Sequence, residues 1–228
     1  MISVQLPGDD ALMLNLAKMR FIQISDLVRS SGWTSLVREL VFLNRTAIVV
    51  EKDLSEVKER SEPLERSKLK LLEIDNEMLS SGSYRFAVKH RYLKALNHLK
   101  HGHRGFAIAR DDVVVGDMWY SPSESTDDPH ALHVDLRRFG FKSWTKNSIY
   151  TFDIFVAPSE RQGGVSAAFQ NNAMLCLRSK GYTKAFGFYW ADNIPAHWCT
   201  SVTNKWKKVR VVRVSRFLIF TKAASPTE

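Results

Sequence analysis

The sequence predicts a mixed α/β domain that carries an N-terminal extension of helices and one strand. The chain has 228 residues, of which 44% are hydrophobic and 25% charged, and these proportions are typical of a globular protein. After the first third, short β-branched runs alternate with segments of helical periodicity. One of these runs leads through two glycines directly into a helix. At about 150 residues per domain, the length fits one domain, residues 66–228, and an extension, residues 1–65.

The extension combines helical and strand patterns. Apolar residues from Leu14 to Leu43 recur at helical spacing around a central Ser-Ser-Gly, which predicts two short helices. Thr46–Val50 is a β-branched run and predicts a strand. Residues 51–70 are rich in both charges and contain Pro63, so we expect a solvated connection there.

Strand and helix patterns alternate through the rest of the chain. Arg85–Leu99 carries an apolar stripe at helical spacing and ends before Gly102, so it predicts a helix. Ala167–Arg178 predicts a second helix, and Pro195–Val202 a short third one. Apolar runs predict the strands; they are Leu71–Ile74, Phe106–Ala109, Val113–Val115, Ile149–Val156, Lys184–Trp190 and one or two strands within Val209–Phe220. The resulting order is β-α-β-β-β-α-β-α-β.

Charge and cysteine content narrow the setting. The 33 Lys and Arg residues exceed the 24 Asp and Glu residues, and the net charge of +9 suggests an anionic partner. No apolar run approaches the ~20 residues that cross a bilayer, and the N-terminus lacks the pattern of a secretory signal, so we expect a cytoplasmic protein without a transmembrane segment. Cys176 and Cys199 are expected to be free thiols, and a disulfide between them stays open.

The most informative segment is a strand that runs through a glycine-bearing loop into a helix, residues 152–166. The first amides of a helix have no intrahelical partners, and the helix dipole adds partial positive charge there. Gly163 and Gly164 would let an anion approach the backbone, and Arg161 adds a full charge at the rim. These residues predict a phosphate-binding loop; the alternative is a strand-to-helix turn whose glycines serve tight geometry only. The common mononucleotide and dinucleotide glycine patterns are absent.

This segment resembles the acyl-CoA-binding motif of the GNAT N-acetyltransferase superfamily. Val156, Pro158, Arg161 and Gly164 match a Val-x-Pro strand end followed by [QR]-x-x-G-x-[GA], with Ser166 in place of the last small residue. The segment from Asn193 to Ala196 is similar to the N-x-x-A sequence that follows the next strand in that family. The order of elements matches as well, over about two thirds of the chain. The resemblance implies a GNAT-like acyl-CoA N-acyltransferase fold.

The resemblance also implies a co-substrate and a reaction. An acetyl or other acyl group would pass from the thioester of acetyl-CoA or another acyl-CoA directly to an amine of a small molecule or a protein, with no metal. The implied cofactor-binding residues are Phe155, Val156 and Ala157, whose backbone would pair with the pantetheine arm where two central strands separate. Asn193 would lie beside the thioester or the end of the pantetheine arm. The amides that would hold the pyrophosphate are those of Gln162, Gly163, Gly164, Val165 and Ser166.

The catalytic groups follow the family pattern less closely than the cofactor-binding groups. An amine acceptor must lose a proton, and the candidate base is Asp153 on the central strand; the alternative is a carboxylate paired with a basic residue. The family often has a tyrosine four residues after the alanine, where it protonates the leaving thiolate, but Thr200 stands here. His197 or Cys199 could supply that proton, or could serve only packing or the surface. The missing tyrosine keeps open a catalytically inactive GNAT-like protein that binds acyl-CoA as a regulator.

A basic run, Lys205–Arg216, gives a third hypothesis. Interleaved positive charges around Trp206 could bind nucleic acid through its phosphates. We favour a half-exposed edge strand whose charges face water, which argues against nucleic acid as a partner. The histidines at 90, 98, 101 and 103 lack the cysteine or carboxylate of a standard zinc set, so no metal is expected. The identity of the amine and the formation of a homodimer stay open.

Overall fold

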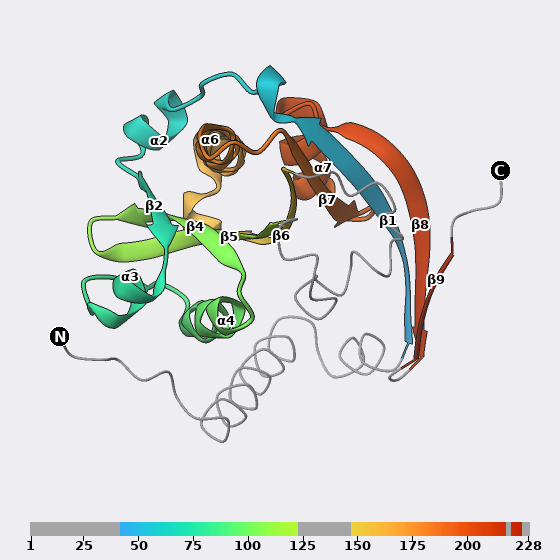
Figure 1. Ribbon diagram of the computed structural model, residues 1–228, viewed down its shortest axis with the longest axis horizontal. Helices are drawn as coiled ribbons and strands as arrows, with labels where there is room; N and C mark the ends of the chain where they lie inside the picture. The colour runs from blue at the N-terminus through green and yellow to red at the C-terminus, as the bar shows by residue number, and fades with distance from the viewer. Residues whose placement is uncertain (1–41, 123–146, 218–219, 225–228) are drawn as a thin grey trace.

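The computed structural model describes residues 42–122, 147–217 and 220–224. The described residues form one sheet of nine strands, in the order β2-β4-β5-β6-β7-β1-β8-β9, with β3 paired to β5. Neighbouring strands are antiparallel except for the pairs β6–β7 and β3–β5, which are parallel (Figure 1). The mixed α/β class that the sequence predicts is confirmed.

Strands and helices alternate along the described chain as the residue patterns indicate. The strands are β1 (Phe42–Asp53), β2 (Lys70–Ile74), β3 (Arg85–Phe86), β4 (Arg104–Arg110), β5 (Val113–Pro122), β6 (Ser148–Val156), β7 (Lys184–Trp190), β8 (Lys207–Phe217) and β9 (Phe220–Ala224). The helices are α2 (Glu62–Arg66), α3 (Asn76–Ser80), α4 (Lys89–Lys100), α6 (Val165–Ser179) and α7 (Ile194–His197), which continues into the π-helical turn Trp198–Thr203. Short 3-10 turns are Leu54–Glu56, Pro158–Glu160 and Gln162–Gly164.

Two predicted elements differ from the structure. The helix expected from Arg85 begins only at Lys89, because Arg85 and Phe86 pair with β5 as strand β3. The connection expected at 51–70 contains the end of β1, a 3-10 turn and α2. The helices expected between Leu14 and Leu43 lie outside the described residues, apart from the last two positions, where β1 begins.

Strand β1 lies inside the sheet and not beside it. It pairs with β7 from Ala47 to Asp53 and with β8 from Phe42 to Glu51. Residues 42–53 therefore belong to the same sheet as the rest of the described chain, although the sequence analysis assigned them to the extension. The division of the whole chain at residue 65 stays a prediction.

The basic run of the sequence lies on β8. The expectation of an edge strand fails only for Arg213–Phe217, which lie between β1 and β9; Lys207–Val212 have β1 as their only neighbour among the described strands. Lys207 and Lys208 are exposed, and Arg213 donates a hydrogen bond to Asn44 Oδ1 at 3.0 Å. In the described ranges, none of the helices has the length and apolar character needed to cross a membrane.

Helices cover both faces of the part of the sheet formed by β2, β4, β5 and β6 (Figure 1). On one face α2 and α6 pack on the sheet, and Phe169, Met174 and Leu177 of α6 are almost completely buried. On the other face α3 and α4 bury Leu79 and Ala95 against the strands. The site described below lies where β6 leaves this two-sided core.

A β-bulge interrupts β6 at Asp153. Asp117 of β5 pairs with Phe155, and Trp119 pairs with Phe152, so two residues of β6 stand opposite one residue of β5. Asp153 has a φ of 50°, in the left-handed region that residues other than glycine seldom adopt. A bulge of this kind bends its strand and increases the local twist.

The strands β6 and β7 separate beside this bulge. Only Ser148–Tyr150 of β6 pair with Lys184–Phe186 of β7, although β6 continues to Val156 and β7 to Trp190. The second half of β6 therefore keeps β5 as its neighbour and turns away from β7. The result is a gap in the middle of the sheet.

Gly116 is required for the close approach of β5 to the bent part of β6. A Cβ atom at this position would lie 2.9 Å from Ile108 Cγ1 and 2.9 Å from the carbonyl oxygen of Phe155. We predict that Gly116→Ala lowers the free energy of unfolding by about 1–3 kcal/mol, as overpacking of a core does. Chemical denaturation measures this change, and a variant as stable as the wild type would contradict the packing described here.

Candidate functional site

The gap between β6 and β7 continues into a cleft with two connected parts. One cavity, of about 220 Å³, lies towards the glycine loop and is lined by Val156, Arg161, Ser166 and Cys199 among others. A second cavity, of about 280 Å³, extends towards Phe188 and Trp190 of β7. Both cavities share five lining residues, which mark where they meet; these are Ile154, Gln170, Asn193, Ala196 and Thr200.

The backbone of β6 meets the first cavity at Val156. The N–H of Ala157 donates to the carbonyl of Val115 at 2.7 Å and so belongs to the contact with β5. Adjacent residues of a strand direct their backbone groups to opposite sides, so the backbone groups of Val156 point towards the gap. The Val156 carbonyl accepts a hydrogen bond from Arg161 Nε at 2.8 Å. Of the three residues expected to present backbone groups to a ligand, Val156 therefore has the suitable direction.

The glycine loop forms an open helix N-terminus. Gly163 and Gly164 have φ values of 63° and 82°, which glycine adopts without strain. Gly164 is the N-cap of the 15-residue helix α6, and no side chain caps this terminus. The first amides of α6 and its dipole therefore offer a place for an anion. This geometry agrees with the phosphate-binding loop that the sequence predicts.

Two arginines lie at this loop, and the sequence analysis found only one of them. Arg161 folds back on the strand end through its hydrogen bond to Val156. Arg66 of α2 donates from Nη2 to the carbonyl of Gly163 at 3.2 Å. The two residues are 97 positions apart, and no local sequence pattern links a residue on α2 to the loop.

Asn193 lies at the junction of the two cavities. Its Oδ1 accepts a hydrogen bond from the amide of Ala196 at 3.1 Å, so the side chain caps α7. The cap holds Ala196 and the following π-helical turn against the cleft, and Asn193 itself lines both cavities.

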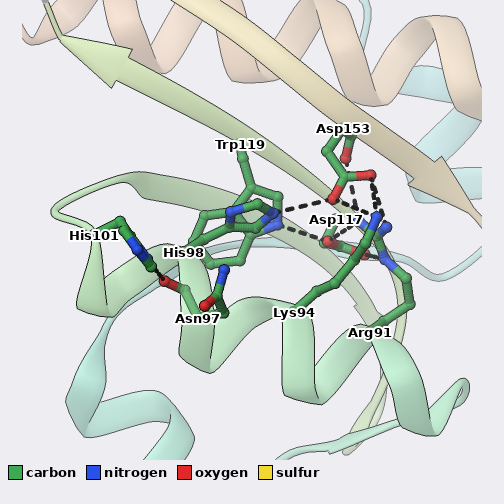
Figure 2. Close-up of polar contacts among 8 residues, drawn as sticks. All are labelled: Arg91, Lys94, Asn97, His98, His101, Asp117, Trp119 and Asp153. Atoms are coloured by element: carbon green, nitrogen blue, oxygen red, sulfur yellow. Dashed lines mark hydrogen bonds and ion pairs between the residues drawn. The ribbon is translucent and has the colours of Figure 1, made fainter. Parts of the chain in front are cut away.

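Asp153, the candidate base, is held by three basic side chains of α4 (Figure 2). Arg91 Nη1 donates to Asp153 Oδ1 at 2.8 Å, and Lys94 Nζ lies 3.0 Å from Oδ2. His98 Nε2 lies 3.1 Å from the same Oδ2. Arg91 Nη2 also donates to the backbone carbonyl of Asp153 at 3.1 Å. These contacts fix both the carboxylate and the backbone of the bulge.

The same arginine is anchored on β5. Arg91 Nε donates to Asp117 Oδ1 at 2.9 Å, and its Nη2 donates to Asp117 Oδ2. Trp119 Nε1 donates to Asp117 Oδ2 at 2.7 Å. The side chains of Arg91 and Asp117 are 4% and 1% exposed, so this two-point ion pair is sealed in the core.

This environment makes Asp153 a poor proton acceptor. Burial alone raises its pKa, but the hydrogen bond from His98 and the positive charges of Arg91 and Lys94 outweigh burial and hold the pKa well below its ordinary value. A general base works best with a pKa near the operating pH. The contacts therefore favour the alternative that the sequence left open, a carboxylate paired with basic residues.

The three positions considered for the proton donor differ in their surroundings. Thr200 is buried at the junction. Burial raises the pKa of the Cys199 thiol to about 11, against the opposing charge of Arg60, so this thiol stays protonated at neutral pH. His197 lines neither cavity itself, but its Nδ1 lies 2.9 Å from the hydroxyl of Tyr189.

Tyr189 is the functional candidate that sequence reasoning missed. Its side chain comes from β7, lines the second cavity and is 8% exposed. The hydroxyl lies 2.9 Å from both His197 Nδ1 and Ser201 Oγ. The only available signal was the alternation of β7, which puts Tyr189 and Gly187 on the same face of the strand.

The remaining expectations concern cysteines and metals. Cys176 and Cys199 are both free, so no disulfide joins them. Within residues 42–122, 147–217 and 220–224, no group of three or more His, Cys, Asp or Glu side chains has a geometry that could hold a metal ion.

The chain is similar in fold to several solved structures. A GCN5-related glucosamine N-acetyltransferase region of a fungal multi-domain GH3 β-N-acetylglucosaminidase matches with a TM-score of 0.56 and 16% identity, over 81% of this chain and 22% of that one. The chain has the GNAT fold. The resemblance seen in the sequence is thereby confirmed at the level of the fold.

Other solved structures are less similar to the chain. An acetyltransferase of the GNAT family from Colwellia psychrerythraea has a TM-score of 0.47 and 10% identity, over 82% of this chain and 61% of that one. A Drosophila protein has a TM-score of 0.47 and 12% identity, over 79% of this chain and 56% of that one. The chain thus spans less than two thirds of each of these structures. No family model and no curated protein matches the sequence.

We predict that Asp153→Asn lowers the free energy of unfolding at pH 7 by about 2 kcal/mol, because hydrogen bonds to a charged group are lost. Since the folded-state pKa of Asp153 lies below its ordinary value of 3.8, the carboxylate stabilises the fold above that pH and loses this effect as the pH falls further. The difference in the free energy of unfolding between the variant and the wild type should therefore become smaller below pH 3.8. Denaturant unfolding at pH values from about 7 to about 3 measures this difference.

Asp192→Asn is the matched control for this experiment. Asp192 pairs with Arg45 at 2.6 Å, and its side chain is 64% exposed, so its loss should cost less than about 1 kcal/mol. Equal costs for the two variants at pH 7 would contradict the anchoring role of Asp153.

Proposed function

We propose that this protein is an acyl-CoA-dependent N-acyltransferase that passes an acetyl or other acyl group from a CoA thioester to an amine. One observation carries the proposal: the gap between the parallel strands β6 and β7 opens directly onto the uncapped N-terminus of α6. A slot lined by strand backbone, ending at an anion-binding helix terminus, suits a long ligand with a phosphate-bearing end. Acyl-CoA has that form, and here it is a substrate that the reaction consumes.

The chain offers separate groups for each part of such a ligand. The backbone of Val156 can pair with an extended amide-bearing arm in the manner of an additional strand. The amides of the Gln162–Gly164 turn and of Ser166 in the first turn of α6 can bind phosphate oxygens, whereas the Val165 N–H already donates to the Gln162 carbonyl. Arg161 and Arg66 add positive charge beside them. The thioester then falls at the junction of the two cavities, beside Asn193.

The acceptor enters from the opposite end of the cleft. The second cavity brings together the aromatic side chains of Phe152, Phe188 and Trp190 with Asp153. Such walls suit an amine with a flat or apolar body. The fungal structure is named a glucosamine N-acetyltransferase region, so amino sugars belong in the same test panel as aromatic amines, amino acids and lysine peptides.

Proton transfer to the leaving thiolate is assigned to Tyr189. Tyr189 lines the second cavity, and its hydroxyl lies 2.9 Å from His197 Nδ1 and from Ser201 Oγ. His197 is exposed to solvent and can return a proton to the phenolate from water. Tyr189 would thus perform the task for which the sequence offers Thr200 at the usual tyrosine position.

An acyl-CoA-binding protein without turnover is the second candidate function. It is favoured by Thr200, which is buried and has no acidic side-chain proton near neutral pH. Both functions require that acetyl-CoA raises the melting temperature. Only the enzyme releases free CoA when an amine is added, so a thiol assay over the amine panel separates them.

We predict that Arg161→Glu weakens CoA binding about ten- to hundredfold, because one cation at the phosphate end becomes an anion. Isothermal titration with CoA measures the affinity. Arg85→Glu is the matched control: it makes the same charge change at an exposed pair with Asp112, on β3, and should leave the affinity within about twofold of the wild type. An equal loss of CoA affinity in both variants would mean that net charge alone causes the effect, and it would contradict the assignment of the loop as the phosphate-binding site.

We predict that Tyr189→Phe lowers kcat at least about a hundredfold, the usual contribution of a general acid or base, with little change in acetyl-CoA affinity. The amine that gives the fastest CoA release in the panel serves as the acceptor, and titration with acetyl-CoA provides the affinity. Ser201→Ala is the comparison variant, because it removes one neighbour of the hydroxyl and leaves the hydroxyl itself. A kcat for Tyr189→Phe close to that of the wild type would exclude the tyrosine as proton donor.

A further inference from the structure

Gln170 stands at the centre of the cleft. It lies in the second turn of α6 and is 2% exposed. Its side chain lines both cavities, as do Asn193 and Thr200. A buried amide at the junction of a cleft needs partners for both of its ends, because an unpaired polar group in the interior costs free energy.

A chain of hydrogen bonds fixes which way this amide points. Asn204 Nδ2 donates to the backbone carbonyl of Ala167 at 3.0 Å, and a backbone carbonyl can only accept, so the nitrogen of Asn204 is assigned. The same Nδ2 donates to Gln170 Oε1 at 2.7 Å. Cys199 Sγ, a weak donor, lies 3.8 Å from that oxygen. The carbonyl end of Gln170 therefore faces these two residues, and the NH₂ end faces away from them.

The NH₂ end of Gln170 has no acceptor in the described part of the protein. No described residue accepts a hydrogen bond from Nε2, although Oε1 has its partners. Some polar side-chain atoms of the described residues are both unpaired and inaccessible to solvent, but Nε2 is not one of them. Because Nε2 is unpaired, it must be accessible from the cavities that Gln170 lines. The cleft thus contains an oriented, neutral hydrogen-bond donor at its junction.

We propose that Gln170 Nε2–H donates to the carbonyl oxygen of the bound thioester and stabilises the negative charge that this oxygen gains during acyl transfer. This inference rests on the proposed function. When the amine nitrogen forms its bond to the carbonyl carbon, the C=O electron pair moves to the oxygen. The positively charged nitrogen of this intermediate then passes one proton to water. When the C=O bond forms again, the C–S bond breaks, and the sulfur gains a proton from Tyr189.

The structure supplies what such a donor needs. A preorganised donor in a site that excludes water stabilises an oxyanion without reorganisation during the reaction. Here the buried hydrogen bonds from Asn204 provide that preorganisation. Asn204 acts as a positioning residue, because it touches Gln170 and not the reacting atoms.

Isotope-edited infrared spectroscopy of bound acetyl-CoA, labelled with ¹³C at the thioester carbonyl, tests the proposal directly. A hydrogen bond lowers the stretching frequency of a carbonyl, so the band should lie lower on the wild-type protein than in Gln170→Met, which keeps the length and most of the volume of the side chain. With an amine acceptor, kcat of this variant should fall about 10²–10³-fold, as for other oxyanion donors, and the KM for acetyl-CoA should change little.

Asn172→Leu is the matched control. It removes an amide from the same helix; that amide donates to the carbonyls of Arg60 and Ala168 and lines neither cavity. Its bound carbonyl band should coincide with that of the wild type. Melting temperatures establish that each variant is folded, and Gln170→Leu provides a second substitution if the methionine variant unfolds.

Three results would overturn the inference. An identical band in the wild type and in a folded Gln170 variant, with acetyl-CoA bound to both, means that another group contacts the carbonyl and that Gln170 serves packing alone. A band that shifts equally in Asn172→Leu leads to the same conclusion. Failure of acetyl-CoA to bind the wild-type protein overturns the proposed function, and the inference with it.

Discussion

The site depends on one buried ion pair, that between Arg91 of α4 and Asp117 of β5. The pair holds the guanidinium in the core, and the same guanidinium then contacts both the carboxylate and the backbone carbonyl of Asp153. It thereby fixes a left-handed residue in the middle of a strand, which would otherwise be costly. Removing one member of such a pair leaves an uncompensated charge in the interior, which costs about 3–5 kcal/mol. The bulge is thus a stable feature of the sheet.

The bulge leads to the gap between β6 and β7 and sets the orientation of the residues beside that gap. Because β6 bends towards β5, its last residues leave β7 and turn the backbone of Val156 to a free edge. The glycine loop then begins where this edge ends. On the other side of the gap, β7 and the π-helical turn present Tyr189 and Thr200 to the cleft. The proposed CoA-binding part and the proposed chemical part of the cleft therefore meet at the junction that Gln170 lines.

Local patterns predicted most of the elements, although not α2, α3 or β3, and the resemblance of the glycine loop to the GNAT motif predicted the fold. The loop with Gly163 and Gly164 was predicted from two glycines between a strand and a helix, and the structure gives both glycines positive φ angles. Strand order was not predicted: nothing in the β-branched run of β1 shows that it lies between β7 and β8. Pairing of Asp153 with a basic residue was one of the two roles considered, but the sequence did not identify Arg91 as the partner, because Arg91 lies 62 positions away. The contacts of Arg66 with the glycine loop and of Asn204 with Gln170 were also not predicted, because these residues lie far apart in the sequence.

The central claim is that the gap between β6 and β7, with the loop that follows, binds acyl-CoA. Hydrogen–deuterium exchange of the full chain with and without acetyl-CoA, read by mass spectrometry, tests it most directly. The account predicts slower exchange on binding in two peptides, residues 154–166 and residues 193–200, with little change in β2 and β4 on the far part of the sheet. Unchanged exchange in residues 154–166 at saturating acetyl-CoA, or protection confined to other segments, would contradict it.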